Sequence, residues 1–193
     1  KDHNVVCGCD EAGRGPLAGD VFAAAVIFDK DTVIEGINDS KKLTVKKREE
    51  LFDEIMEKAV DFSIQTATVE EIEDINILNA AMLAMKRAVE DMDTKPDVCL
   101  IDGNKTPEGL ECPAIAVVKG DAKSQAVAAA SILAKVARDR YMEQMAELYP
   151  EYRFEKHKGY GTKLHYQMID QYGPCGIHRM SFLKKYYAKK NGH

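Results

Sequence analysis

The sequence contains no apolar run long enough to cross a membrane, and no repeat or low-complexity linker. No secretory signal precedes the first predicted strand, although a sequence that starts at Lys1 rather than Met leaves an upstream segment open. These absences argue against a membrane or secreted protein. We therefore expect a cytoplasmic protein without membrane contact.

Cysteine is scarce, and the five cysteines include no Cys-x-x-Cys pair. An odd number without ligand-like spacing argues against both a disulfide framework and a zinc site. Cys7 and Cys9 alternate along a short apolar segment, so small strand residues are a better interpretation for them than metal ligands. A reducing compartment fits this use of cysteine.

Positive charge is also in short supply, because 27 Lys and Arg face 32 Asp and Glu for a formal charge of −5. That balance alone argues against a polyanionic partner. The basic residues nevertheless gather in 41–48, 156–165 and 178–190, whereas acidic residues concentrate in 49–74 and 90–97. A local basic patch can bind phosphates on an acidic protein, although each cluster is also typical of a solvated helix face.

A length of 193 residues, 45% of them hydrophobic and 31% charged, indicates one globular domain. Apolar runs and alternation predict strands at 5–9, 20–28, 62–68, 98–101 and 114–118. Helical spacing predicts helices after Thr44, near 69–74, after Asn76 and from Asp121 to about Leu148.

This order of elements predicts an α/β fold with a mixed central sheet flanked by helices. We expect 1–148 to form the core and 149–193 a C-terminal helical and loop extension that completes the cleft, within one domain overall. The small residues of 128–131 in the last long helix indicate that another element packs closely against it.

Carboxylates follow three of the predicted strands: Asp10 with Glu11, then Asp102, then Asp121. Any one of them is more often a cap or a turn residue than a ligand. In α/β folds, however, ligand sites lie at strand ends, so their shared placement favours one site. Carboxylates without histidine or cysteine select Mg²⁺ or Mn²⁺ over zinc.

Six blocks, in order between about residues 4 and 185, resemble bacterial ribonuclease HII. They are Asp10-Glu11-Ala12-Gly13-Arg14-Gly15, Asp39-Ser40-Lys41-Lys42-Leu43, Leu100-Ile101-Asp102-Gly103, the Asp121 helix with 129–136, His157-Lys158-Gly159-Tyr160 and His178-Arg179-Met180-Ser181-Phe182. One block would be weak evidence, but six in the family's order are strong.

The resemblance implies a ribonuclease H-like fold and a metal-dependent endonuclease that acts on RNA–DNA hybrids. It also implies cleavage 5′ to single ribonucleotides in duplex DNA, with two metal ions and with 3′-hydroxyl and 5′-phosphate products. By matching positions, the metal-binding carboxylates would be Asp10, Glu11, Asp102 and Asp121. The ribose 2′-hydroxyl would be read by Gly13, Arg14, Gly15 and Tyr160.

The basic residues near these blocks are candidates for phosphate contacts, first among them Lys41 and Lys42. His157, Lys158 and Arg179 are weaker candidates, and His178 is better interpreted as structural. We expect a monomer.

Three alternatives stay open at this point. The related ribonuclease HIII has lysine in place of Arg14 and usually a separate N-terminal domain, and neither feature is visible here. A catalytically inactive nucleic-acid-binding module would not need all four carboxylates. A different metal-dependent nuclease or phosphatase could share the carboxylate cluster.

Overall fold

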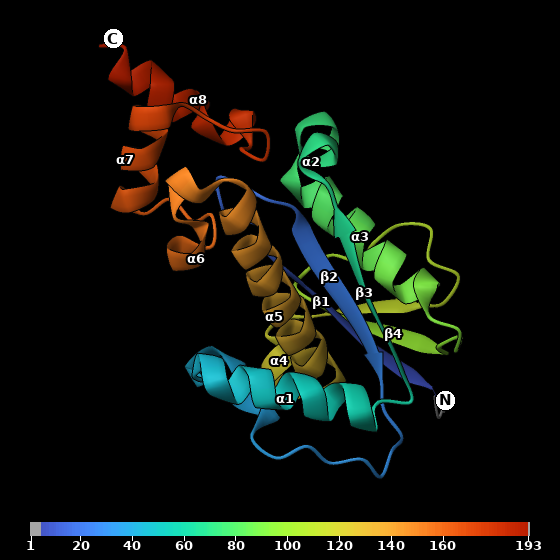
Figure 1. The fold of residues 1–193 in the computed structure, drawn as a ribbon. Helices are drawn as coiled ribbons and strands as arrows, with labels where there is room; N and C mark the ends of the chain where they lie inside the picture. The colour runs from blue at the N-terminus through green and yellow to red at the C-terminus, as the bar shows by residue number, and fades with distance from the viewer. Residues whose placement is uncertain (1–4, 193) are drawn as a thin grey trace.

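The computed structural model describes residues 5–192, apart from the side chains of Asp39 and Ser40. Within this range, five strands form one sheet with the order β3-β2-β1-β4-β5 (Figure 1). β1 pairs antiparallel with β2 and parallel with β4, so the sheet is mixed. The strands are β1 (Val6–Ala12), β2 (Val21–Ile27), β3 (Asp61–Ala67), β4 (Val98–Asp102) and β5 (Ala114–Val117).

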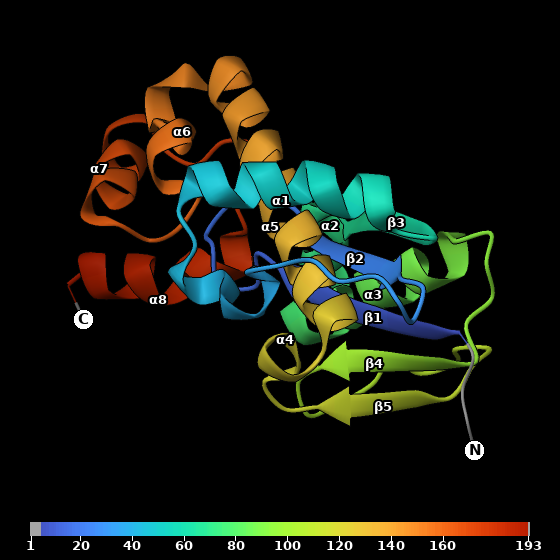
Figure 2. The same cartoon turned by 90° about the horizontal axis from the view of Figure 1, so that it is seen from below.

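Helices cover both faces of the sheet, as the alternation of buried residues in β2 requires. Ala23 and Ala25 face the cluster formed with α2 (Val69–Ile75) and α3 (Ile77–Asp91). Ala24 and Val26 face the opposite cluster, formed with α1 (Val45–Lys58) and α5 (Gln125–Leu148). Figure 2 shows the strands side by side, with α5 in front of the sheet and α3 behind it. The predicted α/β fold with a mixed sheet is thereby confirmed.

The backbone of β1 comes unusually close to α5. A Cβ atom added to Gly8 would lie 2.2 Å from the carbonyl carbon of Ala126, closer than any side chain could tolerate. Ala128, Ala129 and Ala130 are fully buried along the same helix. The prediction that the small residues of 128–131 allow close packing is therefore confirmed, and it fixes α5 directly against the strand that carries Asp10.

The first strand is longer than predicted. β1 continues to Ala12 rather than ending at Cys9, because Asp10, Glu11 and Ala12 still pair with β2. Pairing with β4 on the other side stops at Cys9 and Ile101. Asp10 and Glu11 therefore belong to β1. They pair with β2 on one side, and the pairing with β4 on the other side has ended before them.

Asp121 does not begin the long helix, contrary to the prediction. It lies in the four-residue α4 (Gly120–Lys123), and extended backbone at Ser124, with φ −135° and ψ 125°, separates α4 from α5. The Ser124 side chain accepts a hydrogen bond from the Val127 amide at 3.3 Å and so caps α5. Ser124 is a good N-cap residue, which explains why the helix restarts there.

The chain after residue 148 forms short elements that lie beyond one end of α5 (Figure 1). Tyr152 and Phe154 pack on Met142 of α5, and Ile169 and Leu183 pack on Leu17. These elements are η2 (Pro150–Tyr152), α6 (Phe154–His157), α7 (Lys163–Tyr172) and α8 (Met180–Lys190). The division between 1–148 and 149–193 stays a prediction. None of the helices within residues 5–192 has the length and apolar character needed to cross a membrane.

Candidate active site

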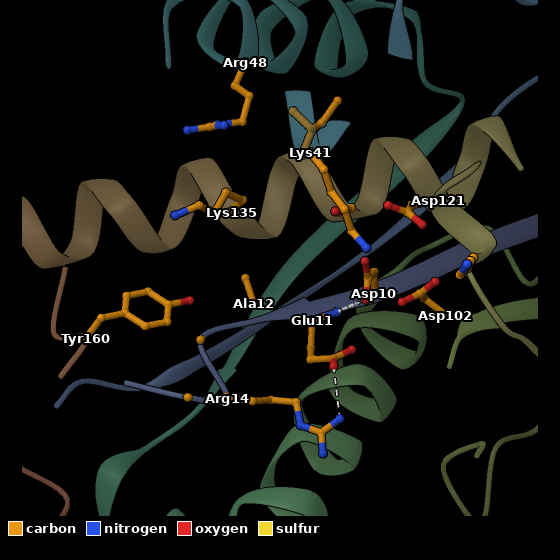
Figure 3. A pocket seen from close by; sticks show the side chains of 15 residues that line it. Asp10, Glu11, Ala12, Arg14, Lys41, Arg48, Asp102, Asp121, Lys135 and Tyr160 are labelled. Carbon is orange, nitrogen blue, oxygen red and sulfur yellow. Dashed lines mark hydrogen bonds and ion pairs between the residues drawn. The ribbon is translucent and has the colours of Figure 1, made fainter. Parts of the chain in front are cut away.

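The register of β1 against β4 brings two of the four carboxylates together. Cys9 pairs with Ile101 in parallel strands, so Asp10 and Asp102, each one residue further, lie side by side on the same face. That face is the α5 side, which Gly8 also faces. Glu11 alternates to the α3 side, and Figure 3 shows its carboxylate beside Arg14.

All four carboxylates border one cavity of about 630 Å³. Asp10 and Glu11 come from β1, Asp102 from the end of β4 and Asp121 from α4. The cavity is lined by Asp10, Glu11, Ala12, Gly13, Arg14, Gly15, Lys41, Arg48, Asp102, Lys119, Asp121, Ser131, Ile132, Lys135 and Tyr160 (Figure 3). A second cavity of about 220 Å³ on the α3 side shares Glu11, Arg14 and Asp102, so these residues lie between two hollows.

Burial makes negative charge costly at this site. It raises the pKa of Asp10 well above its usual value, and the nearby charges of Glu11 and Asp102 raise it further. Burial also raises the pKa of Asp102, with Asp121 and Glu11 contributing, while a hydrogen bond from the Gly120 amide at 2.7 Å opposes the shift. Carboxylates held together in this way favour a positive ligand.

The residues present fit a divalent cation in kind and in charge. Oε2 of Glu11 is buried and has no hydrogen-bond partner within the described part of the chain. The donors are all carboxylate oxygens, which Mg²⁺ and Mn²⁺ prefer. Among the described residues, however, no three His, Cys, Asp or Glu side chains are close enough as they stand to hold one ion. Asp102 accepts from Gly120, and Glu11 lies 3.5 Å from Arg14, so both face protein donors.

Arg179, fully buried, binds the loop that follows β1. Its guanidinium donates to the carbonyl oxygens of Gly13, Arg14, Pro16 and Gly19, at 2.7 to 3.0 Å. The prediction that Arg179 contacts substrate phosphates is therefore wrong, because every one of these bonds lies inside the protein. A planar guanidinium with five donors suits four carbonyl groups that converge from one loop.

Arg138 of α5 binds the same loop from another direction. It donates to the carbonyl oxygens of Ala18, Asp20 and Lys158, at 2.8 to 3.1 Å. A Cβ atom added to Gly13 would lie 2.1 Å from its Nε, and Gly13 has φ +92°, so only glycine fits there. Arg138 was missed as a site residue and Arg179 was given the wrong role, because the sequence does not tell a buried arginine from an exposed one.

Tyr160 reaches the cavity from the turn after α6. Its ring lies beside Gly15, where an added Cβ atom would be 3.7 Å from Cε1, and the residue is 42% exposed. The Leu17 amide donates to the Gly159 carbonyl at 2.8 Å and ties this turn to the glycine loop. The structure thus brings Gly13, Gly15 and Tyr160 together, whereas the Arg14 side chain extends away from Tyr160 toward Glu11 (Figure 3).

Part of the cavity wall is basic. Lys41 of η1 (Ile37–Lys42) belongs to it, but Lys42 does not line the cavity. Arg48, Lys119 and Lys135 also line it and were not among the predicted site residues. Lys135 follows the lining residue Ser131 by four positions on α5, and that spacing on one helix face could have indicated it.

His157 is buried, like Arg179. The prediction that it contacts a phosphate is therefore wrong. Its Nε2 bonds the Tyr152 carbonyl at 2.8 Å, and its Nδ1 accepts from the Gly159 amide. His178 is buried as well, and the Cys175 amide donates to its Nδ1 at 2.8 Å, in agreement with its structural interpretation. Lys158 donates to Glu143 and to the Glu155 carbonyl, and its contact with phosphate stays a prediction.

Comparison with known proteins agrees with this arrangement. The sequence model of the Ribonuclease HII family matches residues 7–185. Ribonuclease HII of Caldicellulosiruptor saccharolyticus is 57% identical over 182 residues, which are 94% of this chain and 88% of that protein. Ribonuclease HII of Idiomarina loihiensis is 59% identical over 178 residues, 92% and 95% of the two chains.

The fold agrees with a solved structure as well. The crystal structure of ribonuclease H2 from Pyrococcus horikoshii OT3 superimposes with a TM-score of 0.79 at 28% identity, covering 98% of this chain and all of that one. Matches of this extent cover both the strands that carry the carboxylates and the segment that carries Tyr160. The chain therefore belongs to the ribonuclease HII family, metal-dependent nucleases that hydrolyse the RNA of RNA–DNA hybrids.

Proposed function

We propose that the protein cuts the RNA strand of RNA–DNA hybrids and also cleaves duplex DNA on the 5′ side of a single embedded ribonucleotide. The observation that carries this proposal is one cavity bordered by four carboxylates at one end and by Gly13, Gly15 and Tyr160 at the other. Carboxylates suit phosphodiester hydrolysis, and a glycine loop beside an aromatic ring suits recognition of one sugar. The products would carry a 3′-hydroxyl and a 5′-phosphate.

The carboxylates would hold two divalent cations, Mg²⁺ or Mn²⁺. Asp10 and Asp102, adjacent on one face, are the natural pair to share one ion, with Glu11 and Asp121 on either side. When bound, such cations lower the pKa of an attacking water and stabilise charge on the leaving 3′ oxygen. The protein then needs no nucleophilic side chain, and its own task is to hold the phosphate in line with the attacking water.

Recognition of the 2′-hydroxyl falls to the loop of Gly13, Arg14 and Gly15, since that group alone distinguishes RNA from DNA. Arg179 already binds the carbonyl oxygens of Gly13 and Arg14. The amide groups of the loop are therefore the better candidates to donate to the 2′ oxygen. Gly15 has no Cβ to hinder the approach of the sugar, and the Tyr160 ring can pack on the next deoxyribose.

The basic residues of the cavity wall would hold the phosphates on either side of the cleaved bond. Lys41, Arg48 and Lys135 line the basic part of the wall (Figure 3). Lys42, on the same turn as Lys41, would contact a phosphate further along the duplex. Contacts of this kind position a duplex without reading its sequence.

The test is cleavage of a DNA duplex with one ribonucleotide, at saturating Mg²⁺, by the wild type and by Asp102→Asn. The substitution removes a ligand charge without changing shape. We expect the variant to lose at least a thousandfold in rate, because the stabilisation of charge in the transition state is the largest contribution to catalysis. Far-UV circular dichroism should be unchanged.

An all-DNA duplex of the same sequence and a full RNA–DNA hybrid are the control substrates. Cleavage of the all-DNA duplex would indicate an unspecific metal nuclease. Binding without cleavage by the wild type would indicate an inactive module of the same fold. Cleavage of the hybrid alone, with the single ribonucleotide left intact, would remove the proposed junction specificity and keep the hybrid activity.

A further inference from the structure

Three buried histidines lie together behind the cavity and take no part in the function proposed above. His157 is 7% exposed, His165 of α7 is 0% exposed and His178, just before α8, is 3% exposed. The rings of His157 and His165 stack with centroids 4.2 Å apart and planes within 11°. None of the three lines the 630 Å³ cavity, yet their hydrogen bonds lead to Tyr160, which does.

The direction of each hydrogen bond in this cluster follows from the backbone amides that enter it. The Cys175 amide can only donate, so Nδ1 of His178 accepts and the proton of His178 lies on Nε2. That Nε2 is 2.9 Å from Nε2 of His165, which must therefore accept. The proton of His165 is then on Nδ1, 2.9 Å from the Tyr160 carbonyl oxygen, to which it donates.

His157 holds the adjacent residue by the same reasoning. The Gly159 amide donates to its Nδ1 at 3.1 Å, so the proton lies on Nε2 and is donated to the Tyr152 carbonyl at 2.8 Å. With all three rings neutral, every ring nitrogen has one partner. A second proton on His165 would set two donors against each other at the facing Nε2 atoms, and a second proton on His178 would do so at its Nδ1, against the Cys175 amide.

The turn held by this cluster is one that the backbone does not favour by itself. Lys158 has φ +53° and Gly159 has φ +90°, two left-handed residues in succession. A Cβ atom on Gly159 would lie 2.7 Å from the Ala18 carbonyl oxygen. External hydrogen bonds must therefore keep the turn in place. Arg138 and Leu17 supply two of them, to the carbonyls of Lys158 and Gly159, and His157 and His165 supply two more, at the Gly159 amide and the Tyr160 carbonyl.

We propose that His157, His165 and His178 form a neutral positioning cluster for Tyr160, in which His165 fixes the Tyr160 backbone so that the ring meets the sugar beside Gly15. This inference rests on the proposed function, since it takes Tyr160 to contact the substrate. The histidines are positioning residues and not catalytic ones. Misplacement of a contact by about 1 Å can lower a rate on the order of a hundredfold.

The surroundings keep the cluster uncharged near neutral pH. Burial lowers the pKa of His165 and of His178 to about 4, and it lowers the pKa of His157 as well. Besides the stacked His165, the titratable groups that face His157 are Glu155, which favours its charged form, and Lys158, which opposes it. Tyr152 faces His178, and the other two histidines face His165.

The test compares two variants of His165 with side chains of similar size. Each variant keeps one of the two hydrogen bonds of the imidazole and loses the other. His165→Asn places an amide where Nδ1 was and can still donate to the Tyr160 carbonyl. His165→Gln places an amide where Nε2 was and can bond only His178. Single-turnover cleavage of the single-ribonucleotide duplex should fall at least tenfold for His165→Gln and less than threefold for His165→Asn. Equal losses in both variants would overturn the proposal.

A double-mutant cycle with Tyr160→Ala separates positioning from general stability. If His165 acts through the tyrosine ring, His165→Gln should cause no further loss in a Tyr160→Ala background. If the rate losses of the two single variants multiply in the double variant, His165 has a role apart from Tyr160 and the inference is overturned. Thermal unfolding of every variant, with Ile72→Val as a control for core destabilisation far from the cluster, shows whether the proteins compared are folded.

Imidazole ¹⁵N chemical shifts of the wild type test the cluster without any activity. The expected result is a proton on Nδ1 of His165 and on Nε2 of His157 and His178, with all rings neutral at pH 6. Opposite tautomers or a charged ring would overturn the inference. If the wild type failed to cut the duplex, the proposed function would fall, and these shifts would still decide whether the cluster exists.

Discussion

Gly13 and Gly15 differ in what they require of glycine, although they stand two residues apart in one motif. Gly13 has φ +92° and the Arg138 side chain in the place of a Cβ atom. At Gly15, the nearest atom to an added Cβ atom is Cε1 of Tyr160, at an ordinary contact distance of 3.7 Å. The first glycine serves the fold, and the second keeps space open next to Tyr160.

Replacement of each glycine by alanine should separate these roles. Gly13→Ala should lower the free energy of unfolding by about 2 kcal/mol or more, because both the backbone and Arg138 must shift. Gly15→Ala should cost less than about 1 kcal/mol, yet it should slow cleavage at a single ribonucleotide by narrowing the gap to Tyr160. Urea unfolding and single-turnover cleavage measure the two effects. Equal stability losses at both positions would contradict this assignment.

The residue types of the site could be predicted from sequence, but their directions could not. Asp10, Glu11, Asp102 and Asp121 were predicted to share a site, and they border one cavity. That Glu11 lies on the α3 side and Asp10 on the α5 side depends on β1 continuing past Cys9, which depends on pairing with β2. The burial of Arg138, Arg179 and His157 depends on packing between distant segments, which periodicity along the chain does not report.

Among the elements, the loop between β1 and β2 depends most on distant partners. Arg179 donates to four of its carbonyl groups and Arg138 to the carbonyls of Ala18 and Asp20 at its end. No ladder pairs this loop along its length, although Ala18 forms one isolated bridge with His178. Helices such as α3 and α5 can be predicted from the spacing of apolar residues within their own sequence. The shape of this loop depends instead on side chains outside it.

Arg179→Lys should therefore destabilise the protein although it keeps the charge. A lysine ammonium cannot reach four carbonyl groups that a planar guanidinium meets together. We expect a loss of about 3–5 kcal/mol, since buried acceptors are left without partners. Arg153→Lys is the matched control, because Arg153 is about half exposed and forms a surface ion pair with Glu155, so its replacement should cost less than about 0.5 kcal/mol. Urea unfolding at neutral pH checks both, and a loss below about 1 kcal/mol for Arg179→Lys would contradict the prediction.

At the scale of the whole molecule, buried histidines and buried carboxyl groups make the free energy of unfolding depend on pH. The histidine cluster holds neutral imidazoles, with the pKa of His165 and His178 lowered from 6.5 to about 4. The unfolded chain therefore binds more protons than the folded protein between these pH values. Stability is then full above pH 6.5 and falls as the pH drops toward 4.

This dependence can be measured as the free energy of unfolding in EDTA between pH 4 and 7.5. Each of the two histidines should contribute a slope of up to about 1.4 kcal/mol per pH unit within the window. His165→Asn should flatten the curve, because it removes one titrating group. Asp10→Asn should instead raise stability at pH 7, where it relieves repulsion among buried carboxylates. The same pH dependence in the wild type and in His165→Asn would contradict the low pKa of His165, because the carboxylates contribute equally to both curves.

The bond from Arg179 to Gly19 joins residues 160 positions apart in the chain. Synthesis proceeds from the N-terminus, so the ribosome makes the loop with Gly13 and Gly15 long before the arginine that shapes it. Domains generally fold as units, so a domain is complete only after its last segment has been made. The strands that carry Asp10 and Asp102 are therefore synthesised well before the arginine that shapes this loop. If this loop reads the ribose as proposed, newly made protein can select a ribonucleotide only after the segment with Arg179 has folded onto it.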